Sequence, residues 1–567
     1  MQKWHKLKKP AASASLRDEL MRLWQKWGQA QVWFAQRGLA LEVTLAYGAL
    51  VAIFLTALVQ FYIPGKGFTY LISFSGQSEA ARLSKLRKLD FHVERASAGY
   101  DAQYYAQIAM DPSLQNKELR KVVDSLPYRA RRILFPAVAH GLGLGQPPAI
   151  LQAYALQNAV AWLLLAVLLL HWFPPRSWDL FLRWTGVMFC FGLCVSLRNS
   201  LIDGPALLLI AFGLYLLEKG RRWSSTVVLA LGGLGKETNL LAAPALLPGP
   251  GAGGRAWGRA LLQGMLLAAP LALWLVYIAR MVGSVADVGY RNFDLPFAAY
   301  LHKWRDVLAA LPETTLLDLG AVWSLVMLVA LTVQLVFLLA RPRWAQAWWR
   351  VGATYAVLMI FLGDAVWEGY PGAASRVLLP MQLAFNILVP VGRSWTLVLL
   401  LGNLTLLAAP AALESPLGDG YEVRGAPALL YSHGGETMQL EFSDTWYATE
   451  RYRREYWCWA ADSGNLQLKN PHSQPLVVRL RFAIDTSGDR EVVLKLNGVT
   501  AWSGFLTEST QVTVVLNNVV LPPGESRIDL ISDTPGRRID EDPRMLKFRL
   551  INLRVDLLKM APAASAP

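Results

Sequence analysis

The sequence predicts a polytopic α-helical membrane protein with about eleven membrane segments and a C-terminal all-β sandwich domain. Hydrophobic residues make up 54% of the 567 residues and charged residues only 17%, against about 25% charged residues in ordinary soluble proteins. The mean hydropathy is +0.30. From about Glu414 onward, short alternating segments replace the long apolar runs. This composition gives more apolar surface than one aqueous core can bury, which excludes a soluble cytosolic enzyme.

Charge is distributed unevenly along the chain. Residues 1–413 contain 38 Lys+Arg and 21 Asp+Glu, a net charge of +17, whereas residues 414–567 contain 17 and 20, a net charge of −3. The overall +14 therefore belongs to the hydrophobic part, where basic residues usually face the cytoplasm or anionic head groups. Membrane lipids, and not nucleic acid, are the expected partners. The cysteines offer no disulfide framework or zinc spacing; they are Cys190, Cys194 and Cys458.

Residues 1–37 are polar and basic and are predicted to form a cytoplasmic segment. The apolar run that follows is long enough to span a bilayer, and it begins too far from the terminus for a signal peptide. A transmembrane domain is therefore predicted over residues 38–413. Its apolar runs cover 39–63, 149–171, 180–198, 201–217, 224–248, 259–280, 316–340, 351–366, 377–390 and 394–412.

The run 224–248 is interrupted by the polar sequence Gly235-Lys236-Glu237-Thr238-Asn239. Two short helices folded into a hairpin place every short basic loop in the cytoplasm, as the distribution of Lys and Arg favours. Broken helices at membrane depth are tolerated where they line a cavity. We therefore expect a hairpin whose Lys236-Glu237 tip points toward an outer cavity, with the N-terminus inside and the C-terminus outside. Three longer segments then open on the outer side: 64–132, 281–315 and 363–376.

The tail 414–567 is predicted to be a periplasmic domain. Apolar positions alternate in 476–482 and 491–496, and turn sequences follow at 497–498 and 522–524. Short strands at this spacing predict an antiparallel sandwich. Aromatic side chains of the tail either stack on sugars or, as is more common, pack in the core; they are Trp446, Tyr447, Tyr452, Tyr456, Trp457, Trp459 and Trp502.

The most informative stretch runs from Gly99 to Tyr105 in the first outer segment. Asp101 precedes a helical pattern that Asp111-Pro112 ends. One interpretation is that Asp101 is only a helix N-cap, whose carboxylate accepts hydrogen bonds from free backbone amides. The other is that this carboxylate, at the outer mouth of a bundle, accepts a proton from a hydroxyl group. The two roles are compatible.

Basic residues near the outer side suit phosphate. The guanidinium groups of Arg129, Arg131 and Arg132 present fixed donor forks for phosphate oxygens, or else extend toward lipid head groups. Three arginines in four residues cannot all point one way on a helix, so one or two are expected to face the site. Lys236 and Glu237 lie in an apolar run, where charges are functional candidates, unless they only pair with each other.

Three further charged residues flank outer turns. Arg198 and Asp203 lie on either side of one short turn and could pair with each other. Arg376 begins a membrane helix from the outside, where its side chain either holds phosphate or marks the membrane interface.

These motifs together resemble the GT-C superfamily of integral-membrane glycosyltransferases, in particular bacterial members with a Tyr-Asp-Gly-Gln motif in the first outer loop. The resemblance covers about residues 40–412. Ala102 stands where the family pattern usually has glycine, and Asp101 has no adjacent second acid, so no metal and no other cofactor is expected. The matching pieces are Tyr100-Asp101-Ala102-Gln103 with the aromatic pair that follows, Tyr128 to Pro136, Gly-Lys-Glu-Thr at 235–238, and the helix that begins near Arg376.

The resemblance implies a membrane enzyme that moves a sugar from a polyprenyl-phosphate donor to a glycan, lipid or protein acceptor. Transfer would take place on the outer face of the bacterial inner membrane and invert the anomeric carbon, with Asp101 as the base. The donor phosphate is expected near Arg129, Arg131, Arg132, Lys236 and Arg376. Supporting roles are expected for Tyr100, Gln103, Tyr104, Glu237, Arg198 and Asp203.

Two other functions remain open. A transporter or flippase of lipid-linked sugars would fit a polytopic chain, but transporters often contain repeated halves with paired broken helices. The sequence contains one broken helix and one long catalytic-looking loop, which favours an enzyme. A polysaccharide polymerase is a closer rival because it would use the same kind of donor.

The first testable prediction concerns topology. Residues 414–567 should lie outside the cytoplasm, because every short basic loop then lies inside. Alkaline phosphatase fused after Leu413 should be active, and a reporter that matures only in the cytoplasm should be inactive at the same position. The reverse result would overturn both the topology and the placement of Asp101.

Overall fold

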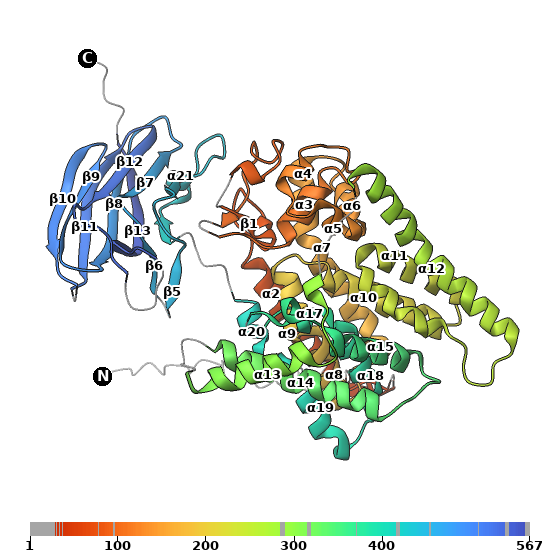
Figure 1. Ribbon diagram of the computed structural model, residues 1–567. Helices are drawn as coiled ribbons and strands as arrows, with labels where there is room; N and C mark the ends of the chain where they lie inside the picture. The colour runs from red at the N-terminus through yellow and green to blue at the C-terminus, as the bar shows by residue number, and fades with distance from the viewer. Residues whose placement is uncertain are drawn as a thin grey trace, which may run out of the picture. The chain divides into compact units, whose positions relative to one another are not determined.

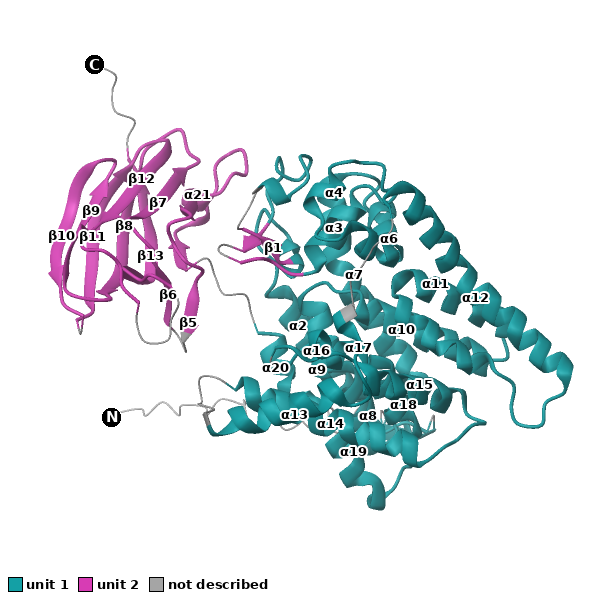
Figure 2. Ribbon diagram, viewed as in Figure 1, with its two compact units in different colours: residues 1–72, 80–91, 101–414 teal, residues 73–79, 92–100, 415–567 magenta. Residues whose placement is uncertain are grey.

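The structure is a computed structural model that describes residues 29, 31–32, 34–36, 38–76, 79–94, 97–283, 290–313, 319–369, 371–414, 420–452, 455–508, 510–538 and 544–561. Most of the expected cytoplasmic segment 1–37 lies outside these residues. The chain forms two compact units (Figure 2). The first contains residues 1–72, 80–91 and 101–414, and the second contains residues 73–79, 92–100 and 415–567.

The first unit is helical (Figure 1). Its longer helices are α2 (Leu41–Val59), α7 (Pro147–Leu168), α8 (Trp178–Met188), α10 (Asp203–Glu218), α11 (Arg222–Gly235), α12 (Gly254–Met281), α13 (Ala298–Ala310), α14 (Gly320–Ala340), α15 (Ala347–Phe361) and α18 (Leu379–Leu388). Shorter helices are α3 (Ala102–Ala109), α4 (Leu119–Val122), α5 (Leu126–Arg129), α6 (Leu134–Leu142), α9 (Phe191–Arg198), α16 (Asp364–Trp367), α17 (Ala374–Val377), α19 (Thr396–Gly402) and α20 (Ala409–Ala412). The 3₁₀ helices include η3 (Ala130–Arg132), η5 (Glu237–Leu246) and η6 (Tyr290–Asn292).

The helical unit with several apolar helices agrees with the predicted fold class. Within the described residues, four helices are long and apolar enough to cross a membrane, and up to six if each bent pair counts as one span. Helices α10, α15 and α18 have only 16, 15 and 10 residues, so each falls short of the roughly 20 residues that a span needs. The predicted count of eleven segments is therefore not confirmed, because apolar composition alone does not give each segment the length of a span.

The core of the first unit combines aromatic stacking with a buried polar network. The Phe54 and Trp162 rings stack with centroids 3.7 Å apart. Gln382 of α18 donates to Asn403 at 2.6 Å and to the Gly186 carbonyl at 3.0 Å, and Asn403 donates to Asn386 at 2.9 Å. Gln334 of α14 also donates to Gln382. In an apolar bundle such side chains satisfy one another, which fixes α18 against its neighbouring helices.

The run 224–248 forms the expected hairpin. Helix α11 ends at Gly235, Lys236 is extended with φ −157° and ψ 123°, and η5 runs back from Glu237. Arg222, at the beginning of α11, donates to the carbonyl of Leu246 at the end of η5 at 2.5 Å. This bond closes the open end of the hairpin and leaves Lys236 and Glu237 at its tip, as predicted.

The second unit is a β-sandwich, which agrees with the predicted C-terminal fold. One sheet has the strand order β10-β9-β12-β7-β4 and the other β11-β8-β13-β6-β5, with β3 paired to β13. The unit also contains β1 (Phe74–Ser75), β2 (Val93–Glu94) and helix α21 (Pro427–Leu430). The sandwich strands are β3 (Tyr421–Arg424), β4 (Gln439–Phe442), β5 (Glu450–Tyr452), β6 (Glu455–Trp459), β7 (Gly464–Asn470), β8 (Leu476–Thr486), β9 (Arg490–Leu496), β10 (Val499–Leu506), β11 (Val512–Leu521), β12 (Gly524–Ile531) and β13 (Phe548–Met560).

The aromatic side chains of the sandwich mostly serve its packing. Trp446 is buried, and its indole donates to the Asn465 carbonyl at 3.0 Å. The guanidinium of Arg549 lies over the rings of Trp457 and Trp459, 5.0 and 5.1 Å from their centroids, so it already occupies the face of each ring. Trp502 packs against the core. The side chain of Tyr452 lies outside the described residues.

Candidate active site

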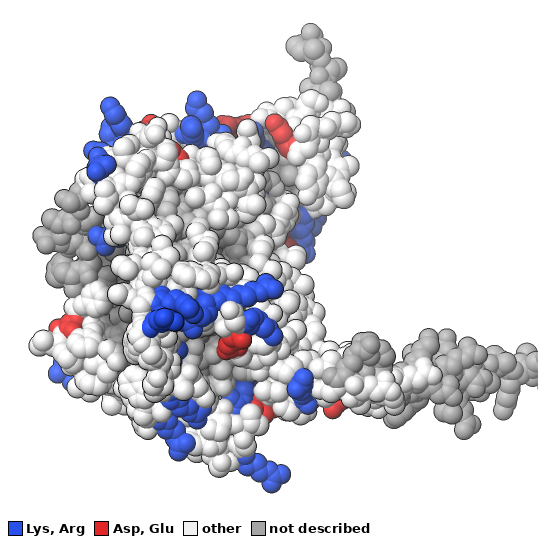
Figure 3. Space-filling model, turned by 90° about the vertical axis from the view of Figure 1, so that its right-hand side faces the viewer, with Lys and Arg blue, Asp and Glu red and all other residues white. Residues whose placement is uncertain are grey.

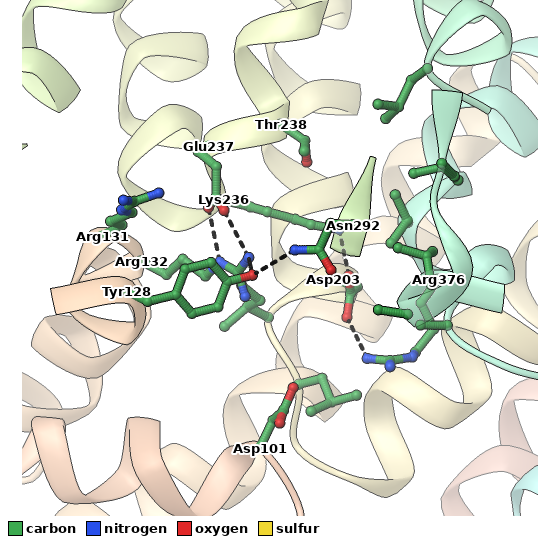
Figure 4. A pocket seen from close by; sticks show the side chains of 18 of the residues that line it. Asp101, Tyr128, Arg131, Arg132, Asp203, Lys236, Glu237, Thr238, Asn292 and Arg376 are labelled. Atoms are coloured by element: carbon green, nitrogen blue, oxygen red, sulfur yellow. Dashed lines mark hydrogen bonds and ion pairs between the residues drawn. The ribbon is translucent and has the colours of Figure 1, made fainter. Parts of the chain in front are cut away.

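A cavity of about 430 Å³ lies in the first unit where several helices end (Figure 4). Charged and polar side chains line one part of it, and apolar side chains of α15, α16 and α17 line another. Its lining residues are Asp101, Tyr105, Tyr128, Arg131, Arg132, Leu201, Ile202, Asp203, Lys236, Glu237, Thr238, Asn292, Phe293, Leu358, Leu362, Ala365, Val366, Ala373, Arg376 and Val377.

The cavity brings the three expected outer segments together. Asp101, Arg131 and Arg132 come from the segment 64–132. Asn292 and Phe293 come from the segment 281–315, and Ala365, Val366, Ala373 and Arg376 from the segment 363–376 or its end. The hairpin tip closes the opposite side from Asp101 (Figure 4). The segments therefore open at the same end of the helical unit, as the sequence predicts.

Asp101 precedes α3 but does not cap it, because its side chain makes no hydrogen bond to the helix backbone. Instead, its carboxylate accepts from Arg129 Nη2 at 3.0 Å. The same guanidinium donates to Asp124 at 2.7 and 3.0 Å. Asp101 therefore shares one cation with a second carboxylate, and its side chain is 41% exposed. The interpretation of Asp101 as only a helix cap is wrong.

Arg129 is a positioning residue for Asp101 and does not line the cavity. Its guanidinium lies 5.1 Å from the ring centroid of Tyr104 and 5.7 Å from that of Tyr105. Burial opposes its charge, but the hydrogen bond to Asp124 and the charge of Asp101 raise the pKa of Arg129 above its ordinary value. Arg129 thus stays protonated and holds the Asp101 carboxylate at the cavity wall.

Arg132 connects the first outer segment to the hairpin tip. Its guanidinium donates to both carboxylate oxygens of Glu237, at 2.7 and 2.9 Å, in a bidentate ion pair. It also donates to the hydroxyl groups of Tyr105 at 2.7 Å and Tyr128 at 3.1 Å. Bidentate pairing fixes both partners in one orientation.

Asp203, at the first residue of α10, is the most buried carboxylate of the cavity. Its side chain is 6% exposed and accepts from Lys236 Nζ at 2.6 Å. Its other oxygen accepts from Arg376 at 3.3 Å. The alternative that Lys236 and Glu237 only pair with each other is wrong, because Lys236 pairs with Asp203 and Glu237 pairs with Arg132.

Arg131 differs from the other cations of the cavity. Its guanidinium lies 5.6 Å from the ring centroid of Tyr128, and among the described residues it forms no ion pair. Arg131 and Arg132 face the cavity and Arg129 does not, which matches the expectation that one or two of the three would do so. Arg131 therefore keeps its charge available for a ligand.

The remaining expected site residues lie away from the cavity. Gln103 is buried in α3, Tyr104 lies against Arg129, and Tyr100 belongs to the other compact unit. Arg198 does not pair with Asp203, whose partners are Lys236 and Arg376, so this alternative is wrong. Its guanidinium lies over the rings of Tyr70 and Phe61, 4.3 and 5.3 Å from their centroids.

Sequence reasoning missed several lining residues. Tyr105 and Tyr128 belong to the stretches from Gly99 to Tyr105 and from Tyr128 to Pro136. A tyrosine hydroxyl that can accept from a nearby arginine, as both accept from Arg132, could have indicated them. Asn292 donates to the Tyr128 hydroxyl at 3.5 Å. No pattern in its loop distinguishes this asparagine from other polar loop residues. The described residues contain no group of three His, Cys, Asp or Glu side chains that could hold a metal ion, and independence from a metal stays a prediction.

No family model and no curated protein matches the sequence. Among solved structures, the arabinosyltransferase EmbB from Mycobacterium smegmatis is similar at 12% identity over 90% of this chain and 64% of that chain, with a TM-score of 0.34. The GH26-CBM35 β-(1,4)-mannanase of Podospora anserina is similar at 14% identity over 23% of this chain and 28% of that chain, with a TM-score of 0.14. A family 29 carbohydrate-binding module matches 22% of this chain at 17% identity, with 84% of the module covered and a TM-score of 0.15. These TM-scores are too low to support an argument about fold or function.

A second prediction follows from the buried cluster around Asp203. The substitution Asp203→Asn leaves two cations without their carboxylate, which typically costs about 3–5 kcal/mol at a buried site. The variant should therefore accumulate at a lower level in membranes and unfold at a lower temperature after purification.

The matched control is Asp124→Asn, which removes a 40% exposed carboxylate from the Arg129 pair. An exposed pair contributes at most about 1 kcal/mol, so this variant should unfold close to the wild-type temperature. Equal destabilisation by the two substitutions would show that the Asp203 cluster does not hold the site together.

Proposed function

We propose that the chain is a membrane glycosyltransferase that transfers a sugar from a polyprenyl-phosphate donor to an acceptor hydroxyl, with inversion, on the outer face of a bacterial inner membrane. The observation that carries the proposal is the meeting of an exposed carboxylate, Asp101, with four cationic side chains in one cavity. A base and a cationic phosphate site within one pocket are the two groups that this reaction needs.

Asp101 is the carboxylate best suited to be the base. Asp203 is 6% exposed, and each of its oxygens already accepts from a cation. Both oxygens of Glu237 are bound by Arg132. Asp101 is more exposed than either, and its one cationic partner among the described residues, Arg129, is shared with Asp124. An acceptor hydroxyl can therefore reach its free oxygen.

Arg131 is the cation best suited to the donor phosphate. Arg132, Lys236 and Arg376 each pair with a carboxylate of the cavity, so they contribute positive potential but are held in place. Arg131 lines the same cavity without an ion pair among the described residues. A guanidinium fork of this kind binds phosphate oxygens with two parallel hydrogen bonds.

A route for the donor's lipid tail lies beside Arg131. Trp274 of α12 donates to the carbonyl of Ala130 at 2.8 Å, so α12 runs next to η3. Only 22% of the apolar window of α12 is buried within the protein. An apolar helix exposed to lipid therefore leads to the phosphate end of the cavity. This arrangement supports a lipid-linked donor over a soluble one.

In the proposed reaction, the acceptor hydroxyl transfers its proton to the Asp101 carboxylate as its oxygen bonds to the anomeric carbon. The bond between that carbon and the phosphate oxygen breaks on the opposite face, and the lipid phosphate leaves with the electron pair. Arg131 and the cations around it stabilise the charge that develops on the phosphate. Phosphate leaves without protonation, so the second carboxylate that glycoside hydrolysis requires is not needed.

The cavity also bears on the alternative of a transporter. A second cavity of the first unit, at the other end of α10, shares no lining residue with the candidate active site. A transport path would need to connect the two ends, whereas a transferase needs only one opening. The polymerase alternative uses the same chemistry with a glycan acceptor and differs only in the product.

The third prediction tests the base. Asp101→Asn keeps the size and the hydrogen bond from Arg129 but cannot accept the proton. Loss of a general base typically lowers the rate about 10²- to 10⁴-fold. The variant should accumulate normally in membranes and transfer almost no sugar from the lipid-phosphate donor. The donor sugar is first identified by mass spectrometry of envelope glycans with and without the protein.

Asp124→Asn is the matched control, because Asp124 is the other partner of Arg129 and does not line the cavity. Its transfer rate should stay within several-fold of the wild type. Full transfer by well-folded Asp101→Asn protein would remove Asp101 from the mechanism.

The fourth prediction separates the roles of the arginines. Arg131→Ala should raise the KM for the donor and lower kcat, since phosphate is present in both the ground state and the transition state. Arg131→Lys keeps the charge without the fork and should recover part of the loss. Arg132→Ala should weaken donor binding and turnover as well, but it should also lower the unfolding temperature, because it leaves the half-buried Glu237 carboxylate without its bidentate partner. An unchanged KM and kcat in Arg131→Ala would place the donor phosphate elsewhere.

A further inference from the structure

A second cavity in the first unit, here called the basal cavity, lies at the end of the helices away from the candidate active site. Helix α10 begins at Asp203 in the active cavity and ends at Glu218 in the basal cavity. Its 16 residues correspond to about 24 Å. The basal cavity has a volume of about 580 Å³, within the range of about 300–1,000 Å³ that is typical of ligand sites.

Three guanidinium groups and one carboxylate line the basal cavity. The cations are Arg222, Arg343 and Arg350, and the carboxylate is Glu218. Glu218 accepts from the indole groups of Trp172 and Trp348, each at 3.0 Å, and lies 3.2 Å from His171. In the described part of the chain, none of the three arginines forms an ion pair with a carboxylate. The cavity therefore carries an uncompensated positive charge.

The described hydrogen-bond partners of these arginines are neutral groups. Arg350 donates to the carbonyls of Pro244 at 2.7 Å and Ala245 at 2.9 Å. Arg343 donates to the Leu388 carbonyl at 2.8 Å. Carbonyl oxygens satisfy hydrogen bonds but do not neutralise three like charges that face one space.

Donor groups also remain for a ligand. Arg222 uses one terminal nitrogen for the Leu246 carbonyl and the Gln263 side chain. Its Nε is buried without a hydrogen-bond partner among the described residues. Arg343 uses only Nη1 in the hydrogen bonds of the described part. Two guanidinium forks are thus incompletely used at one cavity.

We propose that the basal cavity binds a phosphate group, carried either by the head group of an anionic phospholipid or by a soluble phosphate compound. Guanidinium forks match the oxygens of phosphate, and their mutual repulsion is relieved by an anion. Basic pockets between membrane helices are typical sites for anionic head groups. Figure 3 shows a band of Lys and Arg side chains across the face that carries α12 and the connection before it.

The side chains around the basal cavity are of the kind found at the depth of lipid head groups. Trp348 and Trp172 donate their indole groups into its rim, and Trp344 of the adjoining loop is 64% exposed. Indole side chains with one polar contact are enriched at membrane interfaces. Because α10, with 16 residues and a length of about 24 Å, separates the two cavities, the proposal places the basal cavity in the leaflet opposite the active cavity.

Phosphate binding should also stabilise the hairpin. Arg222 holds the end of η5 through Leu246, and Arg350 holds it through Pro244 and Ala245. An anion that lowers the repulsion between Arg222 and Arg350 therefore stabilises the open end of the hairpin. Thermal unfolding of the whole protein should report this binding.

The experiment uses the full-length protein purified in a neutral detergent. Phosphatidylglycerol is the anionic lipid probe and phosphatidylcholine the neutral one, whereas inorganic phosphate and glycerol phosphate test a soluble source. Binding is measured by native mass spectrometry and by the rise in unfolding temperature. The variants are Arg222→Gln, Arg343→Gln and Arg343→Lys, with Arg255→Gln as the control, because Arg255 is exposed near the beginning of α12 and does not line the cavity.

Wild-type protein and Arg255→Gln should bind the same probe saturably, and the two glutamine variants should bind it at least about tenfold more weakly. The affinity of Arg343→Lys, which keeps the charge, should lie between that of the wild type and that of Arg343→Gln. Arg343→Lys should also remain folded if Arg343→Gln does not. Preference for phosphatidylglycerol over phosphatidylcholine, without competition by free phosphates, identifies a lipid head group. Competition by inorganic phosphate or glycerol phosphate identifies a soluble source.

Three results would overturn the proposal. One is equal binding of the two lipids with no effect of free phosphates. Another is an Arg255→Gln variant that loses as much affinity as Arg343→Gln. The third is wild-type affinity in both glutamine variants. None of these results depends on sugar transfer, so they leave the proposed function unaffected.

Discussion

The buried ammonium group of Lys236 places the strongest constraint on the helical unit. A charge at this depth needs a carboxylate within hydrogen-bond distance, since an unpaired buried ion is strongly destabilising. Asp203 supplies that carboxylate at 2.6 Å and also accepts from Arg376 at 3.3 Å. The hairpin tip, the beginning of α10 and helix α17 are thereby tied to one point, and the cavity forms around it.

This constraint explains why similar side chains of the cavity have different roles. Asp203 and Glu237 are held by cations and maintain the arrangement of the segments. The Asp101 side chain is 41% exposed, and it shares its partner, Arg129, with Asp124. Among the cations of the cavity, Arg131 forms no ion pair with a described residue. The groups suited to bind and transform a ligand are those that the structural ion pairs leave uncompensated.

Part of this arrangement was predictable from the sequence. A polar break in an apolar run predicts a turn in the membrane domain, and the hairpin at Lys236 follows from it. The meeting of the three outer segments follows from the distribution of short basic loops. Which charged side chains form ion pairs with each other was not predictable from their proximity in the sequence. Arg198 and Asp203 flank one turn, yet Arg198 packs on aromatic rings whereas Asp203 pairs with residues 33 and 173 positions away.

The two ends of the hairpin are held by different kinds of partner. At the tip, Lys236 forms an ion pair with Asp203 and Glu237 forms one with Arg132, so the tip is tied to two other segments. At the open end, the partners of Arg222 and Arg350 among the described residues are neutral carbonyl groups, which leave both charges uncompensated there. Since α11 and η5 join the two ends directly, a change in charge at the open end alters the free energy of the same element that positions Lys236.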